Sequence, residues 1–447
     1  MTFSSLPELA ALASLPTGVR IPPGVTVPLT PRVRALLDTA AMRRLARVSQ
    51  LGLVSLVYPG AVHTRFEHSL GVYRLALEFL SRLQRDDRFA AAVAEPDAAA
   101  FVAAALLHDV GHWPFCHPIE DMGLAELPKH EALMTGLLAS GDLAGVLEGM
   151  WDLDPARVAS FVTGTASDPA GRILASLLSG PIDIDKMDYL ARDSLHCGVP
   201  YGSHFDQERL LDALCLDEAG GALAISEKGR TAAELMVFAR YVMFSEVYWH
   251  HAVRSATAML QRAIWIVRDR IDPARLVRSD DGGFTAWITA AAAGTAAAPL
   301  VDGLFGERRR LFKRAASFDA LHQPEIHRLL AGRPYADTAA VSARLAAALS
   351  ARLGLRLDAA SLLVDAPPAE REVEFRLQVR ERTPSRGAEG TLRWRRLEDL
   401  SPVVRSLAHE QFDDLVKRVR IFAEPTVAEA VAGCPDLERH VLDAAAG

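Results

Sequence analysis

Histidines gather in one apolar part of this chain of 447 residues, and this feature constrains the fold more than any other. Six of the 14 histidines lie between residues 63 and 130, among many Ala and Leu residues: His63, His68, His108, His112, His117 and His130. Ionisable side chains in a buried neighbourhood are costly unless a metal ion or an anion binds them. The fold therefore has to bring separate segments together around a polar centre.

The hydrophobic pattern predicts a mainly α-helical chain. Apolar residues recur at helical spacing in five stretches, which span residues 31–53, 65–83, 98–110, 174–195 and 231–270. The stretch from Arg65 to Leu83 carries two apolar stripes, so we expect a buried helix there. Pro114 should stop the Ala- and Leu-rich helix or force a turn. Residues 279–300 are rich in Gly and Ala and fit either a helix or a surface loop.

Strand patterns are few and lie mostly near the C-terminus. Residues 213–226 (ALCLDEAGGALAIS) predict a small hairpin that turns at Ala219-Gly220-Gly221. After about Arg352 the character changes. Period-two alternation at Val373, Phe375, Leu377 and Val379 is followed by the turn residues TPSRGAEG, and then by TLRWRRL and RVRIFAEP. We predict a helical core over residues 1–350 and a small α+β C-terminal lobe over residues 351–447.

Composition narrows the classes of function. The formal net charge is −7, whereas general nucleic-acid binders usually show a basic face. Nucleic-acid binding is therefore not expected, although a local basic pocket is compatible with this charge. The four cysteines are scattered, which indicates a reducing compartment. No apolar stretch has the length of a membrane span, and no basic region precedes the N-terminal apolar residues, so we expect a cytoplasmic protein without a membrane partner.

The candidate metal ligands are two histidines and two aspartates in three separate phrases. His68 lies in HTRFEHSLGV, His108 and Asp109 lie in ALLHDVGHWPFCHPIE, and Asp185 lies in PIDIDKMDYLARD. Imidazole nitrogens and carboxylate oxygens together suit one divalent ion, and Mn, Fe, Zn, Co and Mg all fit. Four such ligands leave positions open for water and a phosphate oxygen, as a hydrolase requires.

Each of these residues also has a structural explanation. A histidine on an apolar helix is commonly a satisfied core residue, and an aspartate such as Asp185 can cap a helix. The density of histidines favours the site. His108 and His112 stand four residues apart, so a helix that continued through both would place them on one face, with His117 beyond the turn at Pro114.

The order H…HD…D resembles the HD phosphohydrolase superfamily. The longer phrases YPGAVHTRFEHSLGV, LLHDVGHWPFCHPIE and IDIDKMDYLARD resemble its deoxynucleoside triphosphate (dNTP) triphosphohydrolase branch. The resemblance covers roughly residues 36–260 and, more loosely, the chain through RVRIFAEP. It implies a mainly α, helical HD-domain core with a small α+β C-terminal lobe. It also implies a metal-dependent reaction in which water attacks the α-phosphorus of a dNTP, releasing a deoxynucleoside and inorganic triphosphate.

The resemblance assigns roles to further residues. His117 would act on the leaving 5′-oxygen or on the attacking group, and His112, Glu120 and His130 would be its catalytic neighbours. The substrate would be held by Gln50, Arg65, Lys186, Tyr189, Asp193, Arg240 and Tyr248. Of these, the three basic residues would contact phosphates, the Tyr189 ring would pack where a ribose 2′-hydroxyl would sit, and Gln50 and Asp193 would bind the 3′-hydroxyl. Ordinary surface charges and core tyrosines are the structural alternatives.

This chain also departs from the family pattern. Glu120 stands where the vertebrate relative has Asp, and Trp249 stands where a polar, base-facing side chain is expected, so base preference is open. Ala46 replaces an Arg that takes part in effector binding in the vertebrate enzyme, so the resemblance does not carry over effector-driven assembly. Because bacterial relatives are commonly oligomeric, we expect a homo-oligomer.

Two other functions stay open at this point. The first is an HD-type phosphomonoesterase or phosphodiesterase that acts on nucleoside monophosphates or cyclic dinucleotides, and the identity of the products would separate it from a dNTP triphosphohydrolase. The second is a non-catalytic single-stranded nucleic-acid-binding or scaffold protein with a vestigial site. Salt-sensitive binding to single strands without turnover would indicate that class.

Overall fold

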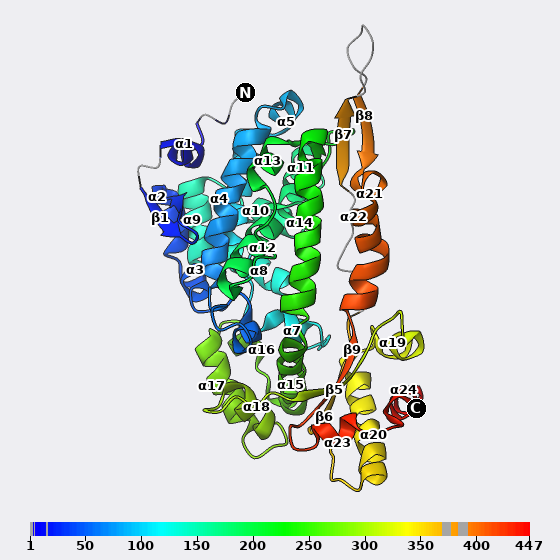
Figure 1. Cartoon of the computed structure of the whole chain (residues 1–447). Coiled ribbons are helices and arrows are strands. Elements are labelled where there is room, and N and C mark those ends of the chain that lie inside the picture. Colours follow the sequence, from blue (N-terminus) through cyan, green and yellow to red (C-terminus); the bar gives the residue numbers. More distant parts are fainter. Residues whose placement is uncertain (1–2, 4, 15–16, 369–376, 383–391) are drawn as a thin grey trace.

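Helices dominate the computed structural model of the chain, which confirms the mainly α prediction (Figure 1). The structure describes residue 3 and residues 5–14, 17–368, 377–382 and 392–447. The first half of the chain forms a helical body with the following helices: α1 (Pro7–Ser14), α2 (Pro31–Leu37), α3 (Ala40–Leu45), α4 (Arg65–Leu83), α5 (Asp87–Ala92), α6 (Glu95–Leu107), α7 (Cys116–Glu120), α8 (His130–Leu138), α9 (Gly141–Trp151), α10 (Pro155–Val162), α11 (Pro169–Leu178), α12 (Ile184–Cys197), α13 (Gln207–Asp212) and α14 (Arg230–Met243).

The second half adds helices to the body and completes a mixed region at the C-terminus. Its helices are α15 (His251–Val267), α16 (Pro273–Leu276), α17 (Asp281–Ala292), α18 (Ala298–Phe305), α19 (Pro324–Leu330), α20 (Tyr335–Leu353), α21 (Leu397–Leu400), α22 (Pro402–Ser406), α23 (Ala428–Ala432) and α24 (Leu437–Ala446). Residues 279–300, which fit either a helix or a loop, thus contribute α17 and the start of α18.

Helix α4 is the centre of the body, and its sequence explains why. The Thr64 side chain caps the helix by accepting a hydrogen bond from the Glu67 amide. The two apolar stripes are both buried, so the predicted helix over residues 65–83 is confirmed with its bounds. Helices α6 and α12 pack against it. The run of alanines in α6 keeps its surface low, and this allows a close approach to α4.

Three of the other predicted helices are divided, and the prediction of continuous helices was wrong there. The stretch from Pro31 breaks at Asp38-Thr39 and its helical part ends at Leu45, before the 3₁₀ turn Gly52–Leu56. The stretch over residues 174–195 is split into α11 and α12, because the Asp183 side chain accepts from the Lys186 amide and starts a new helix. The stretch from Thr231 passes through a π-helix, Phe244–Tyr248, and restarts after His250.

The strands form three small sheets. A hairpin of β1 (Gly18–Ile21) and β2 (Val25–Pro28) precedes α2. The predicted hairpin at Gly220-Gly221 is confirmed as β3 (Leu214–Leu216) and β4 (Leu223–Ser226), and β4 continues into a sheet with β7 (Gln378–Arg382) and β8 (Leu392–Arg396). RVRIFAEP supplies β9 (Val419–Ala423), which lies between β5 (Lys313–Phe318) and β6 (Leu362–Asp365).

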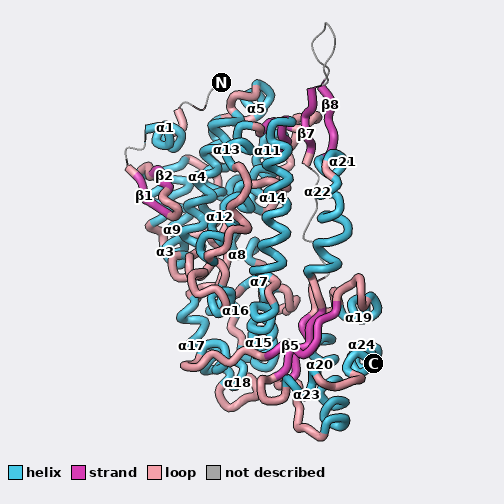
Figure 2. The backbone as a smooth tube through the Cα atoms, viewed as in Figure 1, coloured by secondary structure: helices cyan, strands magenta, loops and turns pink. Residues whose placement is uncertain are grey.

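The two larger sheets lie along one side of the helical body, near its opposite ends (Figure 2). Both contain strands from before and after residue 350, so the predicted boundary at that residue stays a prediction. Val373, Phe375 and the predicted turn TPSRGAEG lie outside the described residues. In the described part of the chain, no helix combines the length and apolarity that crossing a bilayer requires.

Candidate metal centre and substrate pocket

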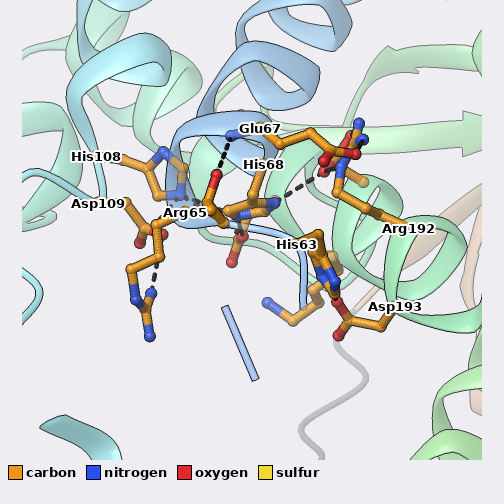
Figure 3. Close-up of polar contacts among 12 residues, drawn as sticks. His63, Arg65, Glu67, His68, His108, Asp109, Arg192 and Asp193 are labelled. Atoms are coloured by element: carbon orange, nitrogen blue, oxygen red, sulfur yellow. Dashed lines mark hydrogen bonds and ion pairs between the residues drawn. The ribbon is translucent and has the colours of Figure 1, made fainter. Parts of the chain in front are cut away.

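Three elements bring the four predicted metal ligands together. His68 lies on α4, His108 and Asp109 follow the end of α6, and Asp185 lies in the first turn of α12. The Nε2 atom of His68 is 3.0 Å from Asp185 Oδ1 and 3.3 Å from His108 Nε2. His108 Nε2 is also 3.4 Å from Asp109 Oδ1 and 3.8 Å from Asp185 Oδ1. Figure 3 shows the two imidazoles converging on one point beside Asp109.

The donor set fits a divalent metal ion because both rings have their other nitrogen occupied. His108 Nδ1 donates to the Ala105 carbonyl at 3.0 Å, and His68 Nδ1 donates to Asp188 Oδ2 at 2.8 Å. These bonds place the Nε2 lone pairs of the two rings toward each other. Metal–nitrogen and metal–oxygen bonds of about 2.0–2.2 Å separate neighbouring ligand atoms by roughly 3 Å, which matches the distances found here.

The charges around His68 also favour a bound cation at this centre. Burial lowers the pKa of His68, but hydrogen bonds with Asp185 and Asp188 outweigh that effect and raise the pKa to about 10. The carboxylates around this ring therefore stabilise positive charge at the point where the ligand atoms meet. A divalent ion provides that charge without a proton on the ring.

An outer ring of charged residues holds these ligands, and the sequence analysis missed it. The Arg192 guanidinium donates to both oxygens of Asp188, at 2.8 Å each, and to Glu67 Oε1 at 2.6 Å (Figure 3). His196 is 2.9 Å from the same Glu67 oxygen. Asp188 and Arg192 are four residues apart on one helix, and this spacing could have predicted their ion pair from the sequence. Such partners fix the ring orientation of metal-binding histidines.

The chain turns sharply after the His-Asp pair. Helix α6 ends at Leu107, so the expectation that His108 and His112 share one helix face was wrong. A turn closes instead, with the His112 amide donating to the Asp109 carbonyl at 2.9 Å. Gly111 lies inside this turn, and a Cβ atom there would be only 2.1 Å from the His130 carbonyl. The glycine therefore allows the start of α8 to approach the centre.

The four predicted catalytic residues form a second cluster next to the metal ligands. His112 Nε2 is 3.2 Å from His117 Nε2, and His112 Nδ1 is 3.0 Å from Asp109 Oδ1. Glu120 accepts from His130 Nδ1 at 2.9 Å and from the His130 amide at 2.7 Å. His117 Nδ1 lies 3.9 Å from the same carboxylate. The cluster thus runs from a metal ligand out to His117, whose side chain is 59% exposed.

The three histidines of this cluster differ in protonation. Burial, with the nearby Arg65 charge, lowers the pKa of His112 well below its usual value. The pKa of His117 is lowered as well, because its ring is partly buried and because Arg65 and His130 add positive charge beside it. Burial also lowers the pKa of His130, but its bonds with Glu120 outweigh that effect and raise it. The surroundings thus favour the neutral form of His112 and His117, whereas Glu120 favours the protonated form of His130.

A cavity of about 510 Å³ opens beside the two clusters, and all seven predicted substrate residues line it. Asp185 and His117 line the same cavity. Lys186, Tyr189 and Asp193 come from one face of α12, since they are spaced three and four residues apart. The others come from separate segments: Gln50, Arg65, Arg240 and Tyr248.

Two buried polar atoms at the cavity await a partner. Among the described residues, neither Gln50 Oε1 nor Arg65 Nε has a hydrogen-bond partner. Arg65 does pair with Asp109 through Nη1, at 2.9 Å. Asp193 is better satisfied, since it accepts from Tyr248 Oη at 2.6 Å and lies 2.9 Å from His63 Nε2. Buried polar atoms are usually satisfied, so Gln50 and Arg65 are open positions for a polar ligand.

The far end of the cavity joins the body to the C-terminal region, which the sequence analysis did not foresee. Trp249 lines this end, and the Arg254 guanidinium stacks 4.4 Å from its ring centroid. Arg254 forms a buried two-pronged ion pair with Asp365 of β6. Pro368, which follows β6, also lines the cavity.

Known proteins resemble the chain in sequence over about half of its length. The uncharacterized protein YwfO of Bacillus subtilis is 37% identical over 232 residues, which make up 51% of this chain and 50% of that protein. An uncharacterized protein of Methanocaldococcus jannaschii is 32% identical over 252 residues, covering 55% and 49%. The deoxynucleoside triphosphate triphosphohydrolase SAMHD1 of Gallus gallus is 30% identical over 270 residues, covering 53% and 43%. The chain thus spans about half the length of these curated relatives.

Solved structures share the fold across nearly the whole chain. A hypothetical protein from Aquifex aeolicus has a TM-score of 0.68 at 24% identity, covering 93% of this chain and 98% of that one. A phosphohydrolase from Bacteroides thetaiotaomicron has a TM-score of 0.66 at 22% identity, covering 91% and 100%. Two family models also match, the HD domain at residues 65–140 and the HD associated region at residues 205–438, which is more than half of the chain. The chain belongs to the HD-domain phosphohydrolase superfamily and is related to its dNTP triphosphohydrolase branch.

Proposed function

We propose that this protein hydrolyses deoxynucleoside triphosphates to deoxynucleosides and inorganic triphosphate. The observation that carries the proposal is the single cavity that contains all seven predicted substrate residues together with Asp185 and His117. The residues come from six separate segments between residues 50 and 248, so chance would not be expected to place them around one space. The similarity to the SAMHD1 enzymes, which act on the same class of substrate, supports it.

The triphosphate would lie at the basic end of the cavity. His68, His108, Asp109 and Asp185 would hold one divalent metal ion, which when bound supplies a Lewis acid that polarises a phosphoryl oxygen. Arg65 and Lys186 would offset much of the remaining charge, about four negative charges in a bound triphosphate. Arg65 is anchored to Asp109 and Lys186 donates to Asp183 at 2.6 Å, so both cations are positioned before substrate binds.

His117 would transfer a proton to the leaving 5′-oxygen. The pKa of its ring is lowered in the free protein, but a bound triphosphate would place negative charge beside it and favour the protonated form. The His112 ring, 3.2 Å away, and the Glu120–His130 pair would position it. The ring would then give its proton to the departing deoxynucleoside.

The sugar would be selected by Tyr189, Gln50 and Asp193. Tyr189 lies on the face of α12 that lines the cavity, where its ring would leave no room for a 2′-hydroxyl. The free Gln50 Oε1 would accept a hydrogen bond from the 3′-hydroxyl. A substrate without that hydroxyl would leave a buried acceptor unpaired, which is costly.

The experiment is a product analysis with purified protein. Each dNTP and each NTP would be incubated with Mn²⁺, and the products would be separated by anion-exchange chromatography. We expect intact triphosphate and deoxynucleoside from dNTPs, and no turnover by the Asp185→Asn variant. Release of orthophosphate, or turnover of cyclic dinucleotides or nucleoside monophosphates alone, would contradict the proposal and leave an HD-type phosphatase or phosphodiesterase. We further propose that the protein works as a homo-oligomer, and a monomeric mass in light scattering would contradict this.

A further inference from the structure

Three histidines and a thiol meet beside the proposed metal centre. Ligand atoms of His112, Cys116, His117 and His130 all lie within 4.8 Å of one another. The closest pair, His112 Nε2 and His117 Nε2, is separated by 3.2 Å. In a tetrahedral zinc site, bonds of about 2.0–2.1 Å to nitrogen and about 2.3 Å to sulfur place ligand atoms roughly 3.3–3.7 Å apart. The cluster is therefore about one ångström wider than a closed zinc site at most.

One of these rings is already oriented as metal-binding histidines are. His130 Nδ1 is held by a hydrogen bond with Glu120 at 2.9 Å, whereas His112 Nδ1 lies 3.0 Å from Asp109 Oδ1 without a hydrogen bond. A carboxylate on one ring nitrogen leaves the other nitrogen for a metal and makes it a better donor. His112 Nε2 faces the His117 ring, with 3.2 Å between the two Nε2 atoms, so one ion could bind both.

The position of each donor allows an ion to enter and to be held. Cys116 is almost fully buried at the start of α7, directly beside the turn that carries His112. His117 has 59% of its side chain exposed and lies on the solvent side of the cluster. The buried thiol and rings would form the base of the site, and His117 would close it from the solvent side.

We propose that His112, Cys116, His117 and His130 form a second metal site that takes Zn²⁺. A set of one thiolate and three imidazoles is softer than the two-histidine, two-aspartate set nearby and favours Zn²⁺ over Mn²⁺ or Mg²⁺. On binding, the Cys116 thiol forms a sulfur–zinc bond and its proton passes to solvent. Where the proposed function holds, this ion would engage the lone pair of His117 and inhibit turnover.

The test uses Co²⁺ as a spectroscopic substitute for Zn²⁺ in the full-length protein. A thiolate bound to Co²⁺ gives a charge-transfer absorption in the near ultraviolet, which ligands of nitrogen and oxygen alone do not give. We expect this absorption in the unchanged protein and in Asp185→Asn, whose altered site contains no thiol. It should be lost in Cys116→Ser and kept in Cys434→Ser, a matched change at a buried cysteine in the C-terminal region.

A second variant is needed because Cys116→Ser changes a buried residue and could disturb the fold. His117→Gln alters an exposed side chain, and we expect it to weaken Zn²⁺ binding by about 100-fold, since even outer partners of metal ligands contribute 10- to 100-fold. Absence of the absorption at saturating Co²⁺, or its survival in a folded Cys116→Ser protein, would overturn the site. Unchanged Zn²⁺ affinity in His117→Gln would also overturn it. None of these readouts needs dNTP hydrolysis, so loss of the proposed function would leave the test intact.

Discussion

At the scale of single residues, Asp188 lies outside the predicted ligand set but contacts the candidate metal centre directly through His68. Its carboxylate accepts from His68 on one side and from Arg192 on the other. We expect Asp188→Asn to lower metal affinity by about 10- to 100-fold, because the amide no longer fixes the His68 ring with a charged acceptor. Metal content after dialysis against graded chelator measures this effect.

The matched control for Asp188 is Asp212→Asn, which removes an exposed carboxylate at the end of α13 that pairs with Arg82 of α4. Its metal affinity should equal that of the unchanged protein. Equal affinity in Asp188→Asn as well would mean that packing, and not this carboxylate, orients His68.

Tyr189 carries the prediction about sugar selection. Shortening it to Ala would open the space from which we propose that Tyr189 excludes the ribose 2′-hydroxyl. The ratio of kcat/KM for dGTP over GTP should then fall by about 10- to 200-fold, the range for a steric contact of this size. Tyr201→Ala, in an exposed turn outside the cavity, is the control. A ratio that stays unchanged in Tyr189→Ala would assign selection to other residues.

Short sequence motifs were enough to predict the candidate residues, but they did not predict the residues that hydrogen-bond to the candidate ligands and orient them. His68, His108, Asp109 and Asp185 stand in short phrases with recognisable spacing, and the structure places them together. Glu67 and His196 are 129 residues apart, and nothing local in the sequence indicates that they meet. The stacking of the Arg254 guanidinium on the Trp249 ring likewise depends on tertiary packing.

At the scale of elements, the contact between α4 and α12 determines whether the ligands converge. Gly71 lies at this contact, where a Cβ atom would be 1.9 Å from Asp188 Oδ1 and 2.3 Å from Arg192 Nη2. We expect Gly71→Ala to destabilise the fold by about 1–3 kcal/mol and to reduce metal content, because it displaces the pair that holds His68. Urea unfolding and metal analysis measure the two effects.

A glycine-to-alanine change at a second position, Gly145, should have the opposite effect on stability. Gly145 lies inside α9, and a Cβ atom there would meet nothing within 4 Å. Gly145→Ala should therefore stabilise the protein by about 0.5–1 kcal/mol through helix propensity, with metal content unchanged. If Gly71→Ala behaved in the same way, the tight contact between the two helices would not be required.

Helix periodicity predicted which segments are helical better than where each helix stops. The helix over residues 65–83 has strong periodicity and a capping Thr64, and its prediction was correct at both ends. Asp183, which starts α12, lies inside an apolar stretch whose pattern continues across the break. The π-helix Phe244–Tyr248 has no distinct pattern either, yet it positions Tyr248 toward Asp193.

At the scale of the whole molecule, strands far apart in sequence connect the C-terminal region to the body. β4 pairs with β7 in parallel, across more than 150 residues, and β5 pairs with β9 across about 100. The hairpin of β3 and β4 was predictable because its two strands are neighbours in sequence. These long-range pairings were not, since alternation marks a strand without identifying its partner.

The buried ion pair between Arg254 and Asp365 also connects the helical body to the C-terminal region. Both side chains are buried, and Arg254 joins α15 of the body to β6. The nearby Arg420 guanidinium lies 4.0 Å from Asp365 as well. Asp365→Asn would leave buried positive charge without its counter-ion, so we expect the free energy of unfolding to fall by about 3–5 kcal/mol.

Two further variants test whether burial of the ion pair causes the expected loss of stability in Asp365→Asn. Asp302→Asn breaks the exposed ion pair with Arg310 and should cost less than about 1 kcal/mol. The double variant Arg254→Met with Asp365→Leu removes both charges, so it should be less destabilised than Asp365→Asn alone. A single variant no worse than Asp302→Asn would show that the C-terminal region is held by its sheets, and Trp249 would then keep its place at the cavity without this pair.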